Sequence, residues 1–275
     1  KSSVVYNSTR SKTFSYGFLY NHINTNIKID KKEAGKSQNN LHIFGKKIKE
    51  DKIYFASMEY QRKGVYTYGN GTLNREDFDN AFTKNNPFYN RFAFTKLLFS
   101  AISTEKEPVK LKHNTIFFIS DLNERSENQI HLSSNLSKII NGLPFNLEIA
   151  LNDYLNYNNP NLRFESVSVQ SFHFSPSTSI TKYGVDFDLG IELHYLSDGT
   201  PFEVFPQIKA TKELVKDVLL VYGGLRHSEH RHTFKTLSDE NPYIHSFGTN
   251  QSILGENSIQ QNLKTTDTDE LYVVI

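Results

Sequence analysis

The chain contains 275 residues, with no cysteine, no tryptophan, 15 tyrosines and 21 phenylalanines, and its formal net charge is +1. This length is sufficient for one all-β domain or for two smaller ones. The balanced charge gives no indication of a nucleic-acid partner, the absence of cysteine excludes a disulfide framework, and the lack of any run of 18 apolar residues excludes a helical membrane span within this sequence.

Alternating apolar and polar residues, bounded by turn-forming residues, predict twelve β-strands and the start of a thirteenth. The predicted strands cover residues 2–10, 13–24, 40–48, 52–62, 91–103, 109–121, 128–140, 145–156, 163–175, 182–196, 202–211, 217–227 and 270–275. Residues 1–275 are interpreted as one barrel region. Because strand-like sequence reaches both ends, we expect the chain to have been cut at each end from something larger.

The strand predicted over 182–196 has the clearest alternation. Its odd positions are apolar or aromatic: Tyr183, Val185, Phe187, Leu189, Ile191, Leu193 and Tyr195. Its even positions include Asp186, Asp188, Glu192 and His194. Successive side chains of a strand point to opposite faces, so one face is apolar with a tyrosine at each end. Apolar residues toward lipid, polar residues toward a wet lumen and aromatic residues at both interfaces are typical of a transmembrane barrel strand. A strand of a soluble sandwich would instead direct the apolar face into its core.

The predicted connections differ in length according to their order. The odd-numbered connections are short, at 11–12, 49–51, 104–108, 141–144, 176–181 and 212–216. The even-numbered ones include the three long loops, 25–39, 63–90 and 228–269. In an up-and-down sheet, odd and even connections lie at opposite ends. Short turns at one end and long loops at the other are typical of outer-membrane barrels, whose long loops are extracellular. Only residues 73–83 have a pattern that could form a short helix.

Two groups of polar residues are candidates for chemistry. His227, His230 and His232 form the most ligand-rich cluster, and imidazole suits zinc, copper or nickel, although solvated loop histidines are the simpler interpretation. Asp186, Asp188, Glu192 and His194 share one strand face, and Lys209 on the next strand is expected to offset their charge. Paired carboxylates can perform acid–base chemistry or bind cations, but a water-filled lumen accounts for such residues without a special role.

Other functional motifs are missing from the sequence. It contains no glycine-rich phosphate loop, no nucleophile elbow, no zinc-protease helix motif and no EF-hand pattern, so neither an enzymatic activity nor a cofactor is predicted. A basic run over residues 28–49 could contact the phosphates of lipopolysaccharide. Some of its lysines fall at the opposite end of the predicted strands, so a solvated charge run is the simpler interpretation.

Several short segments resemble outer-membrane β-barrels of Bacteroidota, particularly those related to TonB-dependent receptors. The resembling segments are Phe205-Pro206-Gln207-Ile208, Tyr222-Gly223-Gly224-Leu225, Thr236-Leu237-Ser238-Asp239-Glu240-Asn241-Pro242-Tyr243-Ile244 and His42-Ile43-Phe44-Gly45-Lys46-Lys47. They look like structural strand and loop signatures, so the resemblance implies a fold and a location in the outer membrane but no binding residues. The energy-coupling box and the plug domain of a TonB-dependent transporter are not visible.

These observations favour an antiparallel up-and-down transmembrane β-barrel, present here in part. The first functional hypothesis is a non-enzymatic outer-membrane receptor, channel or transporter component that binds its ligand or partner through the long loops. The second is a structural subunit of an outer-membrane assembly or secretion complex that transports nothing. The third is a secreted soluble all-β binding module. The expected partners are outer-membrane lipid, lipopolysaccharide and other outer-membrane or periplasmic proteins.

Overall fold

The computed structural model describes residues 1–8, 11–29, 32–66, 89–123, 127–156, 167–199, 201–215, 217–241 and 265–274. These residues form thirteen β-strands and one α-helix. Their bounds are β1 (Ser2–Ser8), β2 (Phe14–Ile29), β3 (Lys32–Ile48), β4 (Lys52–Tyr66), β5 (Tyr89–Ser103), β6 (Lys112–Leu122), β7 (Glu127–Ile140), β8 (Leu143–Asn156), β9 (Val167–Lys182), β10 (Val185–Leu196), β11 (Glu203–Val215), β12 (Leu219–Arg231), α2 (Phe234–Glu240) and β13 (Thr265–Val274).

The strands form one sheet whose strand order is their order in the sequence. Each strand is antiparallel to the next, so the predicted all-β class and up-and-down topology are confirmed. Within the described residues, β1 and β13 each pair on one side only. The sheet is therefore open among these strands, and the barrel, of which the sequence predicts that only a part is present, is not confirmed by them.

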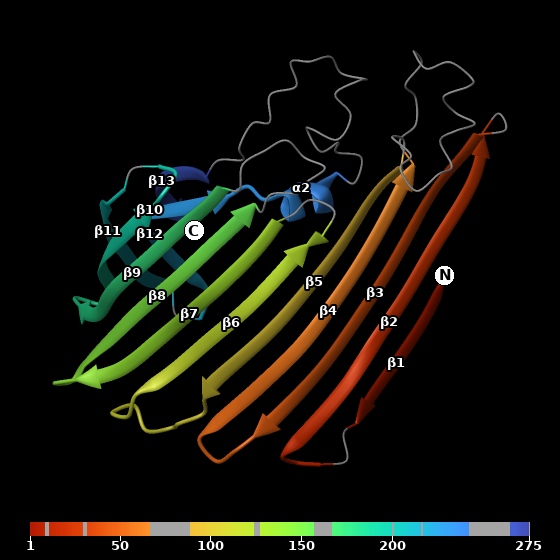
Figure 1. Cartoon of the computed structure of the whole chain (residues 1–275). Coiled ribbons are helices and arrows are strands. Elements are labelled where there is room, and N and C mark those ends of the chain that lie inside the picture. Colours follow the sequence, from red (N-terminus) through yellow and green to blue (C-terminus); the bar gives the residue numbers. More distant parts are fainter. Residues whose placement is uncertain are drawn as a thin grey trace.

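The sheet curves strongly, as Figure 1 shows. Strands β1 to β9 form a broad layer, and β10 to β13 turn behind β8 and β9. This curvature brings together strands that are distant in the sheet order. The guanidinium of Arg231, at the end of β12, lies 5.7 Å from the ring centroid of Tyr154 in β8. The sheet therefore has a concave inner face and a convex outer face.

The longest connections lie at one end of the sheet, as predicted for 63–90 and 228–269 but not for 25–39. At the lower end in Figure 1, β7 and β8 are joined by Asn141-Gly142, and β9 and β10 by Tyr183-Gly184. All four residues have positive φ, between 53° and 82°, as two-residue hairpins of type I′ require. At the other end, β4 and β5 are separated by residues 67–88.

Three of the predicted connections are wrong because they are wholly or mostly strand. β2 and β3 continue through residues 25–39 except at 30–31, β9 continues through 176–181, and β11 continues to Val215 across most of 212–216. The stretch 25–39 has little apolar alternation, so the sequence pattern predicts that each strand ends where the alternation stops. Backbone hydrogen bonds between neighbouring strands need no alternation, so the hairpin continues beyond it.

The expected loop 228–269 is also shorter than predicted. β12 continues to Arg231, α2 follows it, and β13 begins at Thr265 rather than at Glu270. The helix α2 was not predicted. The helix predicted over 73–83 lies outside the described residues.

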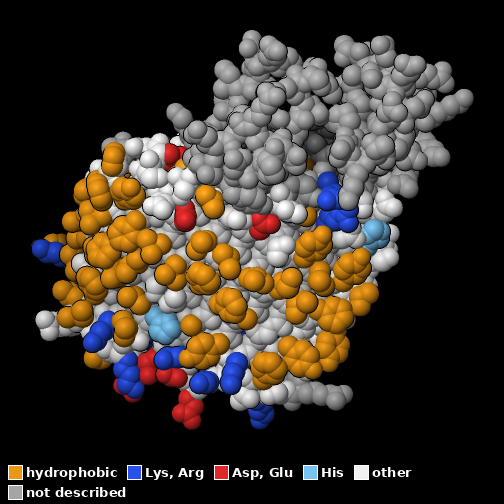
Figure 2. Space-filling model, viewed as in Figure 1, with side chains coloured by type: hydrophobic (Ala, Val, Ile, Leu, Met, Phe, Trp, Pro, Cys, Tyr) orange, Lys and Arg blue, Asp and Glu red, His pale blue; other side chains and the backbone are white. Residues whose placement is uncertain are grey.

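Burial follows an unusual pattern. Apolar side chains form a band across the outer face, with charged residues gathered below it (Figure 2). Among the described residues, seven apolar side chains are buried, whereas 35 large apolar side chains are exposed. The buried polar and charged residues include Glu127, Glu192, His194 and His227. Folded proteins in water bury apolar residues and rarely bury acids, so this sheet reverses the usual arrangement.

Within the described ranges, one cluster of buried apolar residues is found, and it surrounds α2. Phe234 packs on the inner face with Phe92, Phe94 and Leu122, which come from β5 and β6. The chain thus crosses from the end of β12 to the opposite wall of the concave face. This helix and its contacts narrow the upper end of the interior.

Candidate functional site

The strand β10 places its polar side chains on the inner face. Glu192 and His194 are 5% and 3% exposed, whereas their neighbours Ile191 and Leu193 are 52% and 41% exposed. The alternation read from the sequence therefore corresponds to two different environments. Val185, Phe187, Leu189 and Tyr195, which were expected to face lipid, are partly exposed.

Tyr183 has a different position from the one expected. It lies in the turn before β10, with a φ of 55°, and its side chain is 89% exposed. The strand begins at Val185, so the tyrosine at this end marks the turn and not the first position of the apolar face. Gly184 readily adopts the positive φ that this two-residue turn requires. The other central residue of the turn is Tyr183.

The lower half of β10 carries the two aspartates. Asp186 is exposed and accepts a hydrogen bond of 2.6 Å from the Thr181 hydroxyl, and Asp188 accepts one of 2.5 Å from Ser179. Asp188 is opposite Lys209 in the register of β10 and β11. The Lys209 ammonium lies 5.2 Å from the ring centroid of Tyr222. Lys209 therefore lies opposite Asp188 in the sheet, and its offsetting of the acidic charge stays a prediction.

The upper half of β10 belongs to a network of histidine and acid side chains. His173, His194 and Glu203 are cross-strand neighbours on β9, β10 and β11. His173 Nδ1 lies 3.0 Å from Glu192 Oε1. Gln207 donates to Glu192 at 3.4 Å and accepts from Ser175 at 3.1 Å. Paired in this way, the buried carboxylate of Glu192 has partners that offset the cost of burying its charge.

His227 brings β12 and β13 into this network. Its Nδ1 lies 2.9 Å from Asp269 Oδ1, and its ring stacks on Phe205 at 3.7 Å between centroids with an interplanar angle of 4°. The Nε2 atom of His227 is buried and has no hydrogen-bond partner. His194 Nε2 lies 2.6 Å from Glu229 Oε2, but this contact does not have hydrogen-bond geometry.

Two prolines interrupt the sheet around this network. Pro206 pairs with Ile191 of β10, but the ladder from β11 to β12 extends upward only to Ile208 and Leu225. Pro176 likewise pairs with β8, and the ladder from β9 to β10 is interrupted beside it. Proline has no backbone N–H to donate, so each proline leaves a gap on one side of its strand.

The histidine cluster predicted from the sequence is not brought together as a set. His230 is exposed, and its ring lies against His232 at 4.8 Å between centroids. His232 Nε2 lies 3.1 Å from the Thr266 hydroxyl. His227 alone joins the buried network. Among the described residues, the one group of metal-binding side chains in close proximity is His194, Glu203 and His227.

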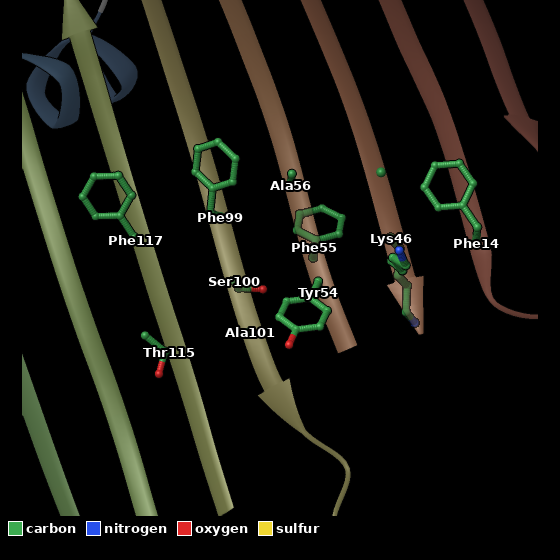
Figure 3. Close-up of a pocket in the computed structure, with 12 residues that line it drawn as sticks. Phe14, Lys46, Tyr54, Phe55, Ala56, Phe99, Ser100, Ala101, Thr115 and Phe117 are labelled. Atoms are coloured by element: carbon green, nitrogen blue, oxygen red, sulfur yellow. The ribbon is translucent and has the colours of Figure 1, made fainter. Parts of the chain in front are cut away.

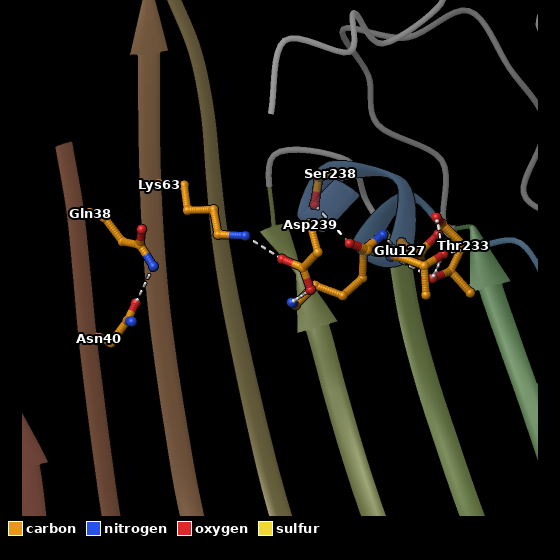
Figure 4. A network of polar contacts seen from close by, with 9 residues as sticks. Gln38, Asn40, Lys63, Glu127, Thr233, Ser238 and Asp239 are labelled. Carbon is orange, nitrogen blue, oxygen red and sulfur yellow. Dashed lines mark hydrogen bonds and ion pairs between the residues drawn. The ribbon is translucent and has the colours of Figure 1, made fainter. Parts of the chain in front are cut away.

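A second polar site surrounds the beginning of α2. The Glu127 carboxylate, at the start of β7, accepts hydrogen bonds of 2.7 Å and 3.1 Å from the backbone N–H groups of Phe234 and Lys235. Thr233 caps the helix through reciprocal hydrogen bonds with Thr236 (Figure 4). The first amides of a helix have no partner within the helix, so a carboxylate there satisfies them and complements the helix dipole.

The other end of α2 is held by charge pairs. Asp239 accepts hydrogen bonds from Lys63 of β4 and from Lys235 (Figure 4). Burial alone would raise the pKa of Asp239, but hydrogen bonds from these two lysines outweigh it and hold that pKa below its ordinary value. A cavity of 350 Å³ lies under the helix, lined by residues of the inner face that include Glu59, Lys96 and Tyr154.

The outer face also has a hollow, of 420 Å³, within the apolar band. Phe14, Tyr54, Phe99 and Phe117 stand around small residues such as Ala56 and Ala101 (Figure 3). The exposed lining of the hollow is mostly apolar, although Lys46, Lys47, Ser100 and Thr115 also line it.

No known protein family has a model that matches this chain, and no curated protein is similar enough to match it. Within the described residues, no helix is long and apolar enough to cross a membrane.

Sequence reasoning missed several members of the inner network. His173, Glu203 and Asp269 have no distinctive local pattern, because each is one polar residue on a separate strand. The signal that unites them is the register between strands, which places His173, His194 and Glu203 side by side. That register depends on turn positions, such as Tyr183-Gly184, that lie well away from the site.

Proposed function

We propose that this chain forms the greater part of a transmembrane β-barrel of the outer-membrane type. The observation that carries the proposal is the reversal of burial between the two faces. Ile191 and Leu193 are exposed outward, whereas Glu192 and His194 between and beside them are buried inward. A lipid bilayer is the environment in which an apolar exposed band is favourable, and a wet lumen is the environment that solvates inward polar residues.

The amount of exposed apolar surface supports the same proposal. Met58, Leu97 and Ile119 are neighbours on β4, β5 and β6, and all three are exposed on the outer face. Proteins in water rarely expose contiguous apolar patches larger than a few hundred Å². A band that continues over many strands needs a covering, and acyl chains supply one.

Closing the sheet into a barrel requires strands in addition to the thirteen described. Edge N–H and C=O groups exposed to lipid cost several kcal/mol each, so the free edges of β1 and β13 require partners. We propose that these come from additional strands of the same polypeptide or from a second chain. Single-chain bacterial barrels have an even number of strands, which is consistent with at least one strand beyond the thirteen described.

The proposed activity is that of a non-enzymatic receptor, channel or transporter component, of the kind related to TonB-dependent receptors. The connections that follow β4, β8 and β12 are the long ones. In the outer membrane, this end of the barrel would face outward and would present residues 67–88, 157–166 and 242–264 to a ligand or partner. Lipid and lipopolysaccharide would contact the outer face.

Conductance in planar bilayers tests this function. The protein, expressed as its full natural polypeptide, should insert into the bilayer and produce a pore that opens or gates. Replacing Lys63 and Glu127 with alanine should increase the open conductance, since both residues hold α2 across the interior. A protein that stays in the aqueous phase without detergent, and does not insert, would contradict the proposal and favour a secreted binding module.

The second candidate is a structural subunit of an outer-membrane assembly or secretion complex, and the position of α2 favours it. The helix, its buried Phe234 and the Glu127 carboxylate occupy the upper part of the interior. A bilayer-inserted protein that conducts nothing, both with the natural sequence and after the Lys63 and Glu127 substitutions, would support this candidate over a channel.

A further inference from the structure

Three strands of the inner face each contribute one potential metal ligand to the same point. One ligand atom from each of His194 on β10, Glu203 on β11 and His227 on β12 lies within 4.8 Å of the others. Ligands of a tetrahedral zinc ion, bound at about 2.0–2.1 Å, are separated by about 3.4 Å. Side-chain rotations that bring the three atoms closer by up to about 1.4 Å would therefore complete three corners of such a site.

The environment of His227 points independently to a ligand. Its Nδ1 lies 2.9 Å from Asp269 Oδ1, and because a carboxylate only accepts, the proton of this hydrogen bond belongs to Nδ1; in the neutral ring, Nε2 then carries the lone pair that a metal binds. That Nε2 atom is buried and has no partner. Histidines that bind metals usually donate their other N–H to a carboxylate, which fixes the ring and its tautomer. Phe205, stacked flat on the imidazole, holds the same orientation.

We propose that His194, Glu203 and His227 bind a divalent transition-metal ion, with Asp269 positioning His227. Two imidazoles and one carboxylate suit zinc and its neighbours in the first row, whereas calcium and magnesium prefer an all-oxygen set. Glu229, whose Oε2 lies 2.6 Å from His194 Nε2, is a candidate for a fourth ligand. The proposal depends only on the inner face and is independent of whether lipid covers the outer face.

The ion would join neighbouring strands of the sheet. The ladder from β11 to β12 does not continue above Ile208 and Leu225, beside Pro206, and the three ligands lie on β10, β11 and β12 around this break. A metal bound by all three strands would join them where backbone hydrogen bonds do not. Binding to the folded state alone also stabilises it by mass action.

Zinc binding by the purified protein tests the proposal, with Zn²⁺ alone as the probe. The chain has no cysteine, so thiols do not compete, and a tag without histidine avoids an artificial site. We expect one Zn²⁺ per chain and an increase in the temperature at which the protein unfolds. His194→Ala, Glu203→Gln and His227→Ala should each weaken binding by about 100-fold or more, and Asp269→Asn by about 10- to 100-fold.

The histidine pair outside the group provides the matched control. A double variant, His230→Ala with His232→Ala, should bind Zn²⁺ with unchanged affinity, and circular dichroism should verify that every variant keeps its sheet. With Cu²⁺ as a second probe, electron paramagnetic resonance should detect two nitrogen ligands in the natural sequence and one in His227→Ala. Binding that is lost in the control and kept in His194→Ala and His227→Ala would overturn the proposal. An absence of stoichiometric binding by the folded natural protein would also overturn it.

Discussion

Placing a charge in the middle of the outer band gives a quantitative test of its environment. Leu97 lies on β5 with Met58 and Ile119 as its cross-strand neighbours, and its side chain is 37% exposed. In lipid, an arginine on the outer face of a barrel costs about 2–4 kcal/mol near the bilayer midplane and about 0–1 kcal/mol near the interfaces. In water, a substitution at such a surface position usually changes stability by less than about 0.5 kcal/mol.

The position of Leu97 supports the larger value. Tyr54 lies four residues before Met58 on β4, at about 3.3 Å per residue, so the two are separated by about 13 Å along the strand. With a strand tilt of about 40°, this corresponds to about 10 Å along the membrane normal, within an apolar band of about 25 Å. Lys47 pairs with Tyr54, which places Tyr54 near the lower edge of the band. We therefore expect Leu97→Arg to destabilise the protein by about 2–4 kcal/mol and Tyr54→Arg by about 0–1 kcal/mol.

The assay is equilibrium unfolding of the protein in lipid vesicles by guanidinium chloride. Because the chain has no tryptophan, unfolding is followed by circular dichroism and by electrophoretic mobility without heating. Leu97→Ala is the control for lost packing, and the difference between the arginine and alanine variants isolates the charge. Equal stability of Leu97→Arg and Tyr54→Arg, each within about 0.5 kcal/mol of the natural protein, would refute the placement of this face in lipid.

Three further predictions concern the sheet and α2. A Cβ atom at Gly224 would lie 2.2 Å from the Ile208 carbonyl oxygen, whereas a Cβ atom at Gly45 would meet nothing within 4 Å. Gly224→Ala should therefore lower the free energy of unfolding by about 1–3 kcal/mol, and Gly45→Ala should leave it unchanged. Equal effects of these two substitutions in the same unfolding assay would contradict the close packing of β11 on β12. Glu127→Gln should speed hydrogen exchange at the amides of Phe234 and Lys235, measured by mass spectrometry, while Glu148→Gln leaves it unchanged, and unchanged exchange in Glu127→Gln would contradict the capping role. The two lysine partners of Asp239 hold its pKa below the ordinary value of about 3.9. Asp239 therefore stabilises α2 at any pH at or above that ordinary pKa, and this stabilisation is lost as the pH falls through the lowered pKa. Protease sensitivity of α2 should accordingly rise only in strongly acid solution, and this pH dependence should disappear in Asp239→Asn.

The fold was largely predictable because the strands and turns of an up-and-down sheet are indicated by local sequence patterns. Alternation along 182–196 placed β10 nearly correctly, and glycine in Asn141-Gly142 marks a turn that local sequence determines. Strand ends beyond the apolar alternation were not predictable, as the segment 25–39 demonstrates. There the backbone pairing continues, but no alternation in side-chain polarity reports it.

The inner network was predictable in part. The polar face of β10 gave Glu192 and His194, because period-two alternation identifies one strand at a time. The partners Glu203, His173 and Asp269 come from other strands, and register between strands decides them. The prediction of one cluster formed by His227, His230 and His232 was wrong because histidines that are close in the sequence of a strand do not all lie on the same face. The helix α2 escaped because its seven residues carry only Phe234 and Leu237 as apolar members, too few to define a helical period.

The most direct measurement of the central claim is a nitroxide scan along β4 in lipid vesicles. The chain has no native cysteine, so single-cysteine variants from Tyr54 to Glu59 can each be labelled without background. Collision with oxygen, which concentrates in lipid, should peak at positions 54, 56 and 58. Collision with a water-soluble nickel complex should peak at positions 55, 57 and 59. The opposite alternation, or high nickel accessibility at positions 54, 56 and 58, would mean that water and not lipid covers the outer face.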